Sequence, residues 1–300
     1  MMKALLAALL GAGWMLSGAD LAQAQPYPNR PIRMVVPFPA GGPTDGMARI
    51  ISDRLSVVLG QSVVVENRGG GAGGSIGAKA VATADPDGYT ILITPGGSLT
   101  SGPAVHANIG YDPVKAFVPV CELIETPQVL AVHHDLPVKT VADTVKYAKA
   151  NPGKISWGSQ GFGTAPMLAA VVAGEVQVVI DPLTTVLPHI QSGALRALAI
   201  AGAQRSPKLP DVPTAPEAGF PNLLSPFWLG VVAPAGTPPA INDKLNAAFR
   251  ESLAHAETRE LLDKLGAEIK IGTPAEFEKM LANERAKWTA IVKAANIKVD

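Results

Sequence analysis

Cysteine is almost absent from this chain of 300 residues. The single thiol, Cys121, lies in an apolar stretch, which predicts a packed side chain rather than a reactive one. One cysteine forms no internal disulfide, so the folded chain has to be stabilised by its hydrophobic core.

The chain also lacks an excess of charge of either sign. Its 25 Lys and Arg residues balance 25 Asp and Glu residues, and no basic or acidic block occurs. This composition argues against a nucleic-acid groove and against a membrane-binding face. A charged ligand would therefore have to be recognised locally.

Long apolar runs are missing after the N-terminus, where Lys3 precedes an apolar run from Ala4 to Leu16. That run is shorter than the roughly 20 residues that a membrane-spanning helix needs. A small-residue site, Ala22-Gln23-Ala24, follows it. We therefore expect residues 1–24 to be a cleaved secretory signal peptide, with an uncleaved anchor as the alternative.

After this segment, short β-branched runs alternate with amphipathic helices, which predicts an α/β fold. The remaining length, about 275 residues, exceeds a comfortable single core and predicts two domains. The expected strands of the first unit are Arg33–Phe38, Val63–Val65 and Thr90–Thr94, with helices at Met47–Val58 and Ser75–Ala82 between them.

A second unit is expected to start near Val129. Its expected strands are Val129–Val132, Ile155–Trp157, Val176–Ile180 and Leu195–Ile200, with helices at Val141–Ala150 and Pro166–Ala173. Leu229–Val232 is a candidate return strand, and helices are expected at Pro238–Ala254, at Glu257–Leu265 and after a capping box at Thr273–Glu276.

Two glycine loops follow expected strands, and ligands of an open parallel sheet lie beyond the carboxyl ends of its strands. Gly41 and Gly42 precede a helix whose first N–H groups attract a carboxylate. We expect Gly42 to approach the ligand in a conformation that a β-carbon would obstruct. Gly96, Gly97 and Ser98 form a similar loop. Asp45 either binds an ammonium or hydroxyl group or complements the helix dipole.

Three further patterns point only weakly to chemistry. Gly69–Gly74 satisfies G-x-G-x-x-G, but no acidic residue ends the next strand to hold a ribose, so a tight turn is favoured. His133, His134 and Asp135 suggest a metal, but neighbours on a strand point apart and no second ligand cluster exists. Ser159 lacks the first glycine of a nucleophile elbow. We expect no metal and no cofactor, and an α/β enzyme is the less favoured alternative.

Several linked motifs together resemble the receptor proteins of tripartite tricarboxylate transporters, the Bug family. They are Tyr27–Arg33, Val35–Asp45, Val65–Arg68, Asp87–Thr90 and Leu209–Thr214. The resemblance implies a type II periplasmic binding protein-like fold of two α/β lobes with a ligand cleft between them. It implies a periplasmic receptor without catalysis, which captures a small carboxylate and delivers it to the permease subunits of a membrane transporter.

The resemblance also implies the lobes and the site. Residues 25–122 and 230–300 would form lobe 1, and residues 123–229 lobe 2. The residues implied around the ligand carboxylate are Phe38, Ala40, Gly41, Gly42, Thr44 and Asp45, then Gly96, Gly97 and Ser98, and across the cleft Gly161, Gly163, Thr164 and Asp181.

The second lobe departs from the family pattern near residues 164–166. Family members have a helix, a strand and another helix before the strand that ends at Asp181, whereas this chain has room for one helix. Roughly 30 residues, the size of a crossover unit, are missing by this comparison. We therefore expect Ile155 and Trp157 to be exposed, and a degenerate exported paralogue that no longer binds a ligand is an alternative function.

Overall fold

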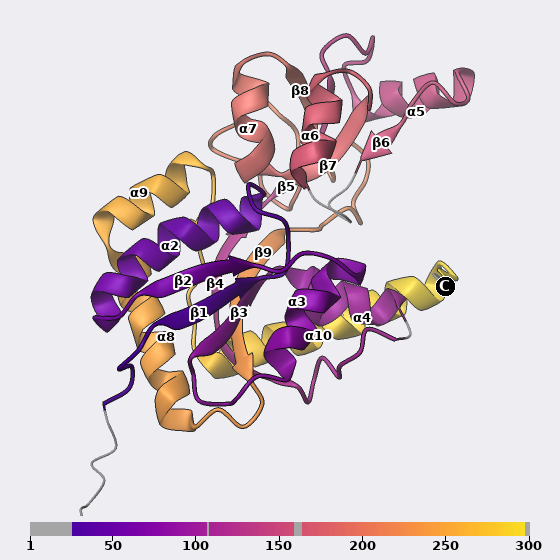
Figure 1. Cartoon of the computed structure of the whole chain (residues 1–300). Coiled ribbons are helices and arrows are strands. Elements are labelled where there is room, and N and C mark those ends of the chain that lie inside the picture. The colour runs from indigo at the N-terminus through magenta and orange to yellow at the C-terminus, as the bar shows by residue number, and fades with distance from the viewer. Residues whose placement is uncertain (1–25, 107, 159–163, 298–300) are drawn as a thin grey trace, which may run out of the picture.

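The computed structural model describes residues 26–106, 108–158 and 164–297. Two β-sheets, each flanked by helices, form two lobes that lie one above the other (Figure 1). We call the six-stranded sheet with its helices the first lobe and the four-stranded sheet with its helices the second lobe. This is the two-lobed α/β fold expected from the sequence.

The first lobe is built on a mixed sheet with the strand order β10-β4-β9-β3-β1-β2. β1 pairs in parallel with β2 and with β3, as a βαβαβ unit requires. All five residues of β3 are buried, as is typical of a central strand covered on both faces. The strands are β1 (Ile32–Val36), β2 (Val63–Asn67), β3 (Thr90–Thr94), β4 (Phe117–Thr126), β9 (Phe227–Pro234) and β10 (Glu268–Ile269).

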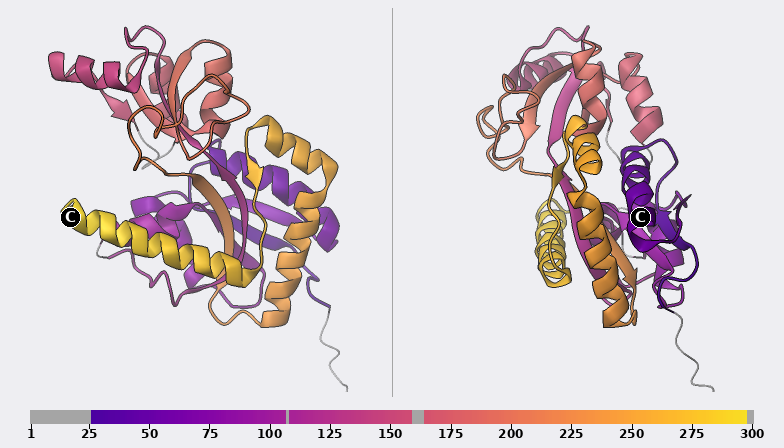
Figure 2. Two further views of the ribbon diagram at one scale, coloured as in Figure 1. Left: turned by 180° about the vertical axis from the view of Figure 1, so that it is seen from behind. Right: turned by 90° about the vertical axis from the view of Figure 1, so that its left-hand side faces the viewer.

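Helices cover both faces of this sheet (Figure 2). One face packs against α2 (Pro43–Leu59), α8 (Pro239–Ala254) and α9 (Ala256–Lys264). The other packs against α3 (Ser75–Ala82), η2 (Gly97–Ser101) and α10 (Pro274–Ala294). The predicted capping box at the start of α10 is confirmed, because Thr273 and Glu276 exchange side-chain-to-backbone hydrogen bonds.

The second lobe is built on a sheet with the order β6-β7-β5-β8. Its strands are β5 (Gln128–His133), β6 (Trp157–Gly158), β7 (Val178–Pro182) and β8 (Leu195–Ala201). Helices α6 (Thr164–Val172) and α7 (Leu183–Gln191) pack on one face, and α5 (Val141–Ala150) packs on the other. Both faces of this smaller sheet therefore carry a hydrophobic core.

Two crossings join the lobes. Only Pro127 separates β4 in the first lobe from β5 in the second. The chain returns through residues 202–226 and enters β9, which pairs with β3 and β4. Cys121 lies on β4 with no exposed surface, as expected, and burial raises the pKa of its thiol. None of the helices in the described part of the chain has the length and apolar character needed to cross a membrane.

The edge of the second sheet lies shortly before residues 164–166, where the sequence predicts a departure from the family pattern. β6 is an edge strand that pairs in parallel with β7 alone. Trp157 on this strand has 69% of its surface exposed, as predicted. The expectation for Ile155 is wrong, because its side chain packs against the core under α5.

Candidate functional site

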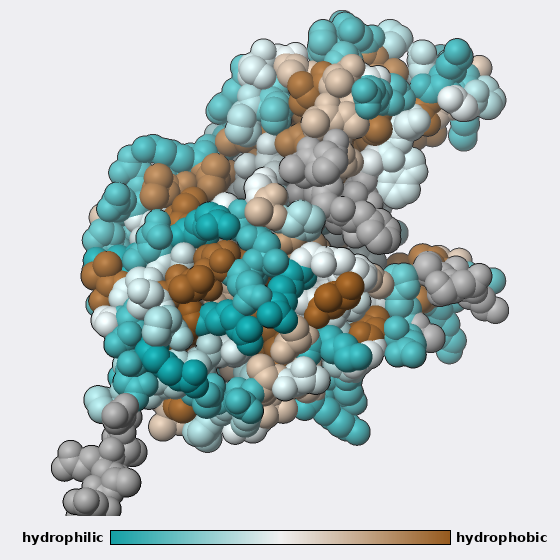
Figure 3. Space-filling view, in the orientation of Figure 1, coloured by the Kyte–Doolittle hydropathy of each residue, from teal (hydrophilic) through white to brown (hydrophobic). Residues whose placement is uncertain are grey.

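A cavity of about 470 Å³ lies between the lobes, within the range of roughly 300–1,000 Å³ found for small-molecule sites. The hollow between the lobes is visible at one side of the molecule in Figure 3. The first lobe contributes Phe38, which follows β1, and Gly96 and Gly97, which follow β3. The second lobe contributes Gln128, Trp157 and Ile180. Three residues expected at the site from sequence therefore line this cavity.

The loop after β3 is held by a direct backbone contact with the glycine-rich turn at residues 69–74. A β-carbon on Gly73 would lie 2.4 Å from the carbonyl oxygen of Gly97, so neither loop has room for a side chain there. Gly73 also has a φ of 58°, in the left-handed region. The prediction of a tight turn is confirmed, and the sequence reading missed that Ala72 and Gly73 also line the cavity.

Ser98 is buried beneath the loop after β3. Its hydroxyl oxygen lies 2.8 Å from the carbonyl oxygen of Gly73 and 3.0 Å from the hydroxyl oxygen of Thr94. The Tyr111 hydroxyl donates a hydrogen bond of 2.6 Å to the Ser98 carbonyl oxygen. The Ser98 side chain thus joins the two glycine loops, and Gly96 and Gly97, rather than Ser98, line the cavity.

The loop after β1 leads into α2, whose N-cap residue Gly42 provides no side-chain acceptor. Gly42 has φ −81° and ψ 172°, an extended conformation open to any residue, so its backbone angles do not require glycine, and its close approach to a ligand stays a prediction. Gly41, with φ 83°, is the residue that needs a glycine conformation. Gly41 and Pro43 line a smaller cavity of about 270 Å³ that faces α6 and α7.

Asp45 stabilises this loop from the first turn of α2. Its carboxylate accepts a hydrogen bond of 2.9 Å from the Gly41 N–H and pairs with Arg49. Burial by itself raises the pKa of Asp45, but hydrogen bonds from Arg49, Gly41 and Asn67 lower it below its ordinary value. The carboxylate is therefore charged and already engaged. These contacts favour the structural interpretation of Asp45 over a ligand contact.

The other residues expected at the site lie in different surroundings. Ala40 is exposed in the loop before α2, and Thr44 is buried in the first turn of that helix. Asp181 is fully buried on β7, opposite Val129. Thr164 is the first residue of α6, and Gly161 and Gly163 lie outside the described residues.

A larger cavity of about 710 Å³ lies where the chain crosses between the lobes, a region that we call the hinge. It is lined by residues 202–208 and by residues near β10. Its cations already have partners: Arg205 pairs with Glu217, and Lys208 pairs with Asp263 at 2.8 Å. Neither glycine loop lines it. The 470 Å³ cavity between the lobes is therefore the better candidate for an anionic ligand, despite its smaller size.

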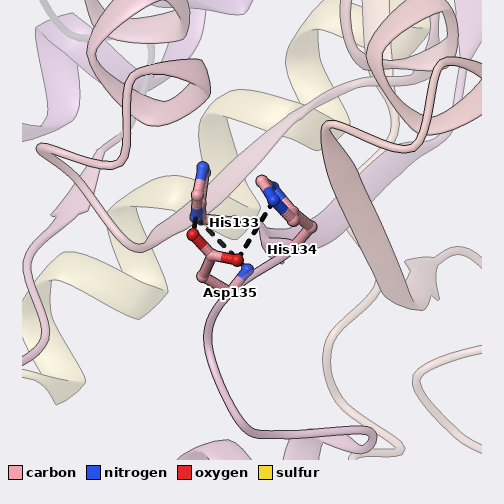
Figure 4. A group of neighbouring side chains, drawn as sticks. All are labelled: His133, His134 and Asp135. Atoms are coloured by element: carbon pink, nitrogen blue, oxygen red, sulfur yellow. Dashed lines mark hydrogen bonds and ion pairs between the residues drawn. The ribbon is translucent and has the colours of Figure 1, made fainter.

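His133, His134 and Asp135 lie close together, contrary to the expectation that they point apart (Figure 4). β5 ends at His133 and the chain turns, so the two rings lie 4.3 Å apart between centroids. The His134 Nε2 lies 3.1 Å from Asp135, and the Asp135 N–H donates to the His133 Nδ1. These contacts close the turn at the end of β5 away from the hinge.

The sequence profile described as "Tripartite tricarboxylate transporter family receptor" matches residues 47–170 and 162–297. The chain belongs to this receptor family. It is 35% identical to the protein BugT of Bordetella pertussis over 302 aligned positions, which cover 92% of each chain. It is 36% identical to a UPF0065 protein of Pseudomonas sp. strain P51 over 292 positions, which cover 89% of this chain and 86% of the relative.

Solved structures of the receptor family share the fold closely. The periplasmic binding protein BugD superposes with a TM-score of 0.86 at 33% identity, covering 91% of this chain and 99% of BugD. MatC from Rhodopseudomonas palustris, solved with bound malate, gives a TM-score of 0.85 at 33% identity, covering 89% of this chain and all of MatC. The two-lobed periplasmic binding protein fold is thus shared over most of the chain.

The alignments also contain positions that this receptor lacks. The Pseudomonas alignment spans 292 positions but includes only 89% of the 300 residues, about 267, so about 25 positions have no counterpart here. The BugT alignment gives a similar difference, with 302 positions against about 276 residues. The two matches to the family profile meet at residues 162–170, at the start of α6.

Proposed function

We propose that this chain is a periplasmic receptor that binds a small carboxylate between its lobes and delivers it to the permease subunits of a tripartite transporter. The observation that carries the proposal is the position of the loop after β3. It opens onto the 470 Å³ cavity and begins η2, where backbone N–H groups favour an anion. MatC with malate and a second R. palustris protein solved with adipate, at 34% identity, support a carboxylate ligand.

The two lobes would hold the ligand by closing over it. The cavity draws its lining from both lobes, while the chain crosses between them at Pro127 and through residues 202–226. Because so few crossings join the lobes, the lobes can move about them as about a hinge. A ligand that contacts both lobes then favours the closed state. The permease would then recognise the closed receptor.

Export and the absence of catalysis belong to the same proposal. Residues 1–24 would be removed on export, leaving a chain that starts at Gln25. Ser101 and His106 both line the cavity, but no hydrogen bond joins their side chains within the described residues. This pair is therefore not arranged as a nucleophile and its base, which favours a receptor over an enzyme.

The first prediction tests this function by thermal unfolding of residues 25–300 with a panel of carboxylates that includes malate and adipate. A ligand at about 100 times its Kd should stabilise the protein by about 2.7 kcal/mol. The matched amides should give no shift, because they lack the charge. Consumption of a stabilising acid, followed by NMR, would point to an enzyme, and a panel without any stabilising acid would point to a degenerate paralogue.

A further inference from the structure

The cavity between the lobes gathers aromatic side chains from a chain that has few. Only 15 of the 300 residues are Phe, Trp or Tyr, and five of them line this cavity. They are Phe38, Trp157, Phe227, Trp228 and Trp288. The fourth tryptophan, Trp14, lies in the expected signal peptide, so every tryptophan of the exported chain faces the same space.

The tryptophans approach the cavity from both lobes. Trp157 comes from edge strand β6 of the second lobe and is largely exposed. Trp228, at the start of β9, is 95% buried and packs edge-on against Phe277, with ring centroids 5.8 Å apart. A β-carbon on Gly96 would lie 3.3 Å from the Trp228 ring, so the indole lies directly against the loop after β3.

Trp288 forms a further wall, from α10 of the first lobe. Its indole N–H donates a hydrogen bond of 3.1 Å to Glu284, whose other carboxylate oxygen accepts from Lys287. Lys287 also reaches the carbonyl oxygen of Leu224 in the crossing segment. These contacts hold the Trp288 ring in place, so Trp157 would be the wall that moves if the second lobe closes over a ligand.

The charges in the cavity suit only one carboxylate. No Lys or Arg occurs among the described residues that line it, and the ionisable groups there are His106 and Glu284. One carboxylate has the N–H groups around Gly96 and Gly97 as partners. A second carboxylate would meet aromatic rings, Glu284 or neutral side chains such as Ser101, Gln128 and Ser225, so its charge would have no Lys or Arg partner among the described lining residues, and burying such a charge is unfavourable.

We propose that the ligand is an aromatic monocarboxylate whose ring lies between Trp157 and the Trp228–Trp288 wall, with its carboxylate at the loop after β3. The inference rests on the proposed function and narrows its ligand class. Aromatic side chains favour an aromatic partner through offset or edge-to-face contacts beyond the area that they bury. The aliphatic dicarboxylates seen in two relatives would therefore be poor ligands here.

Calorimetric titration of residues 25–300 tests the ligand class with four probes: benzoate, cyclohexanecarboxylate, malate and adipate. Benzoate should bind about 5- to 10-fold more tightly than its saturated analogue, the gain expected for one or two aromatic contacts. Because all three tryptophans line the cavity, benzoate should also change the intrinsic fluorescence. Tighter binding of malate or adipate would overturn the inference and leave the receptor function intact, whereas failure of all four acids would count against both.

Trp157→Leu tests the position of the ring. The affinity for benzoate should fall about 5- to 10-fold more than that for cyclohexanecarboxylate, because both acids lose apolar contact area but only benzoate loses an aromatic contact. Tyr147→Leu is the matched control, since Tyr147 is in the same lobe, packs in the core beneath α5 and does not line the cavity. Unfolding curves establish that both variants fold. An equal loss for both acids, or the same loss in the control, would overturn the proposed stacking.

Discussion

Glu122 is a half-buried carboxyl group on β4 that should make stability depend on pH. Burial and the neighbouring Glu125 raise its pKa from 4.5 to about 7, while Lys270 partly offsets them. Because the folded-state pKa lies above the unfolded value, folding favours the protonated form. This contribution is complete below about pH 4.5 and is lost as the pH rises through 7.

We therefore predict that Glu122→Gln stabilises the protein at pH 8 and has little effect at pH 5. The expected gain is about 1 kcal/mol after allowance for solvent screening, or about 2–4 °C in Tm. Glu251→Gln on α8 is the control, because Glu251 is exposed and forms no ion pair with any described residue. Equal Tm changes for Glu122→Gln at the two pH values would show that Glu122 titrates normally.

Single residues of the candidate site were predictable where local chain geometry decides their position. Phe38, Gly96 and Gly97 follow parallel strands and line the cavity, because carboxyl ends of such strands meet at one edge. Trp157, Trp228 and Trp288 lie on β6, β9 and α10, and no local pattern links them. Only the packing of the two lobes brings them together, so sequence spacing could not reveal the aromatic lining.

The glycine-rich turn and η2 form one structural unit, in which Gly73 is the contact point. We predict that Gly73→Ala destabilises the protein more than Gly60→Ala, as measured by denaturant unfolding. Both glycines have left-handed φ values, 58° and 65°, but the space around Gly60 is open. The difference should be about 2 kcal/mol, within the range of about 1–3 kcal/mol for overpacking.

The same pair of variants tests the link to the ligand. The alanine β-carbon at Gly73 has to displace the carbonyl group of Gly97, so Gly73→Ala should also weaken carboxylate binding. Gly60→Ala lies at the far end of α2 and should bind normally. Equal stability of the two variants would show that the loops separate at little cost.

Elements with regular patterns were predicted closely, whereas interrupted ones were missed. The bounds of β3, α3 and α5 agree with the sequence prediction. β4 was missed as a strand because Pro119 and two register shifts break its alternation. α7 was missed because it is short, follows Pro182 and contains Pro188, a residue that ordinarily ends helices.

At the scale of the whole molecule, the two-lobed architecture could be expected from the sequence, but the packing of the lobes could not. Alternation of strands and helices predicts layers, and the length predicts two cores. The position of the cavity depends on β4 passing into β5 at Pro127 and on the return through residues 202–226. These are contacts between distant parts of the chain, which local periodicity does not encode.

A shortening of the second lobe near residues 164–166, as the sequence predicts, would have a structural consequence at its edge. The relatives contain about 25 aligned positions without a counterpart here, and the two matches to the family profile overlap at residues 162–170. In the described residues, β6 has β7 as its single neighbour and exposes Trp157. We infer that the missing positions would pair with or cover this edge, which otherwise exposes backbone hydrogen-bonding groups.

The last prediction is that restoring the segment stabilises the molecule. Grafting a relative's additional helix and strand between Thr164 and Ala165 should raise the Tm, because a new strand on β6 satisfies its outer N–H and C=O groups. Trp157 should become less exposed, and its fluorescence should shift to shorter wavelength. The matched control is a Gly/Ser insert of equal length at the same position, which adds loop entropy without contacts and should leave the Tm unchanged or lower it. If graft and control behave alike, the second lobe has adjusted its packing to the shorter chain, and β6 is a stable edge as it stands.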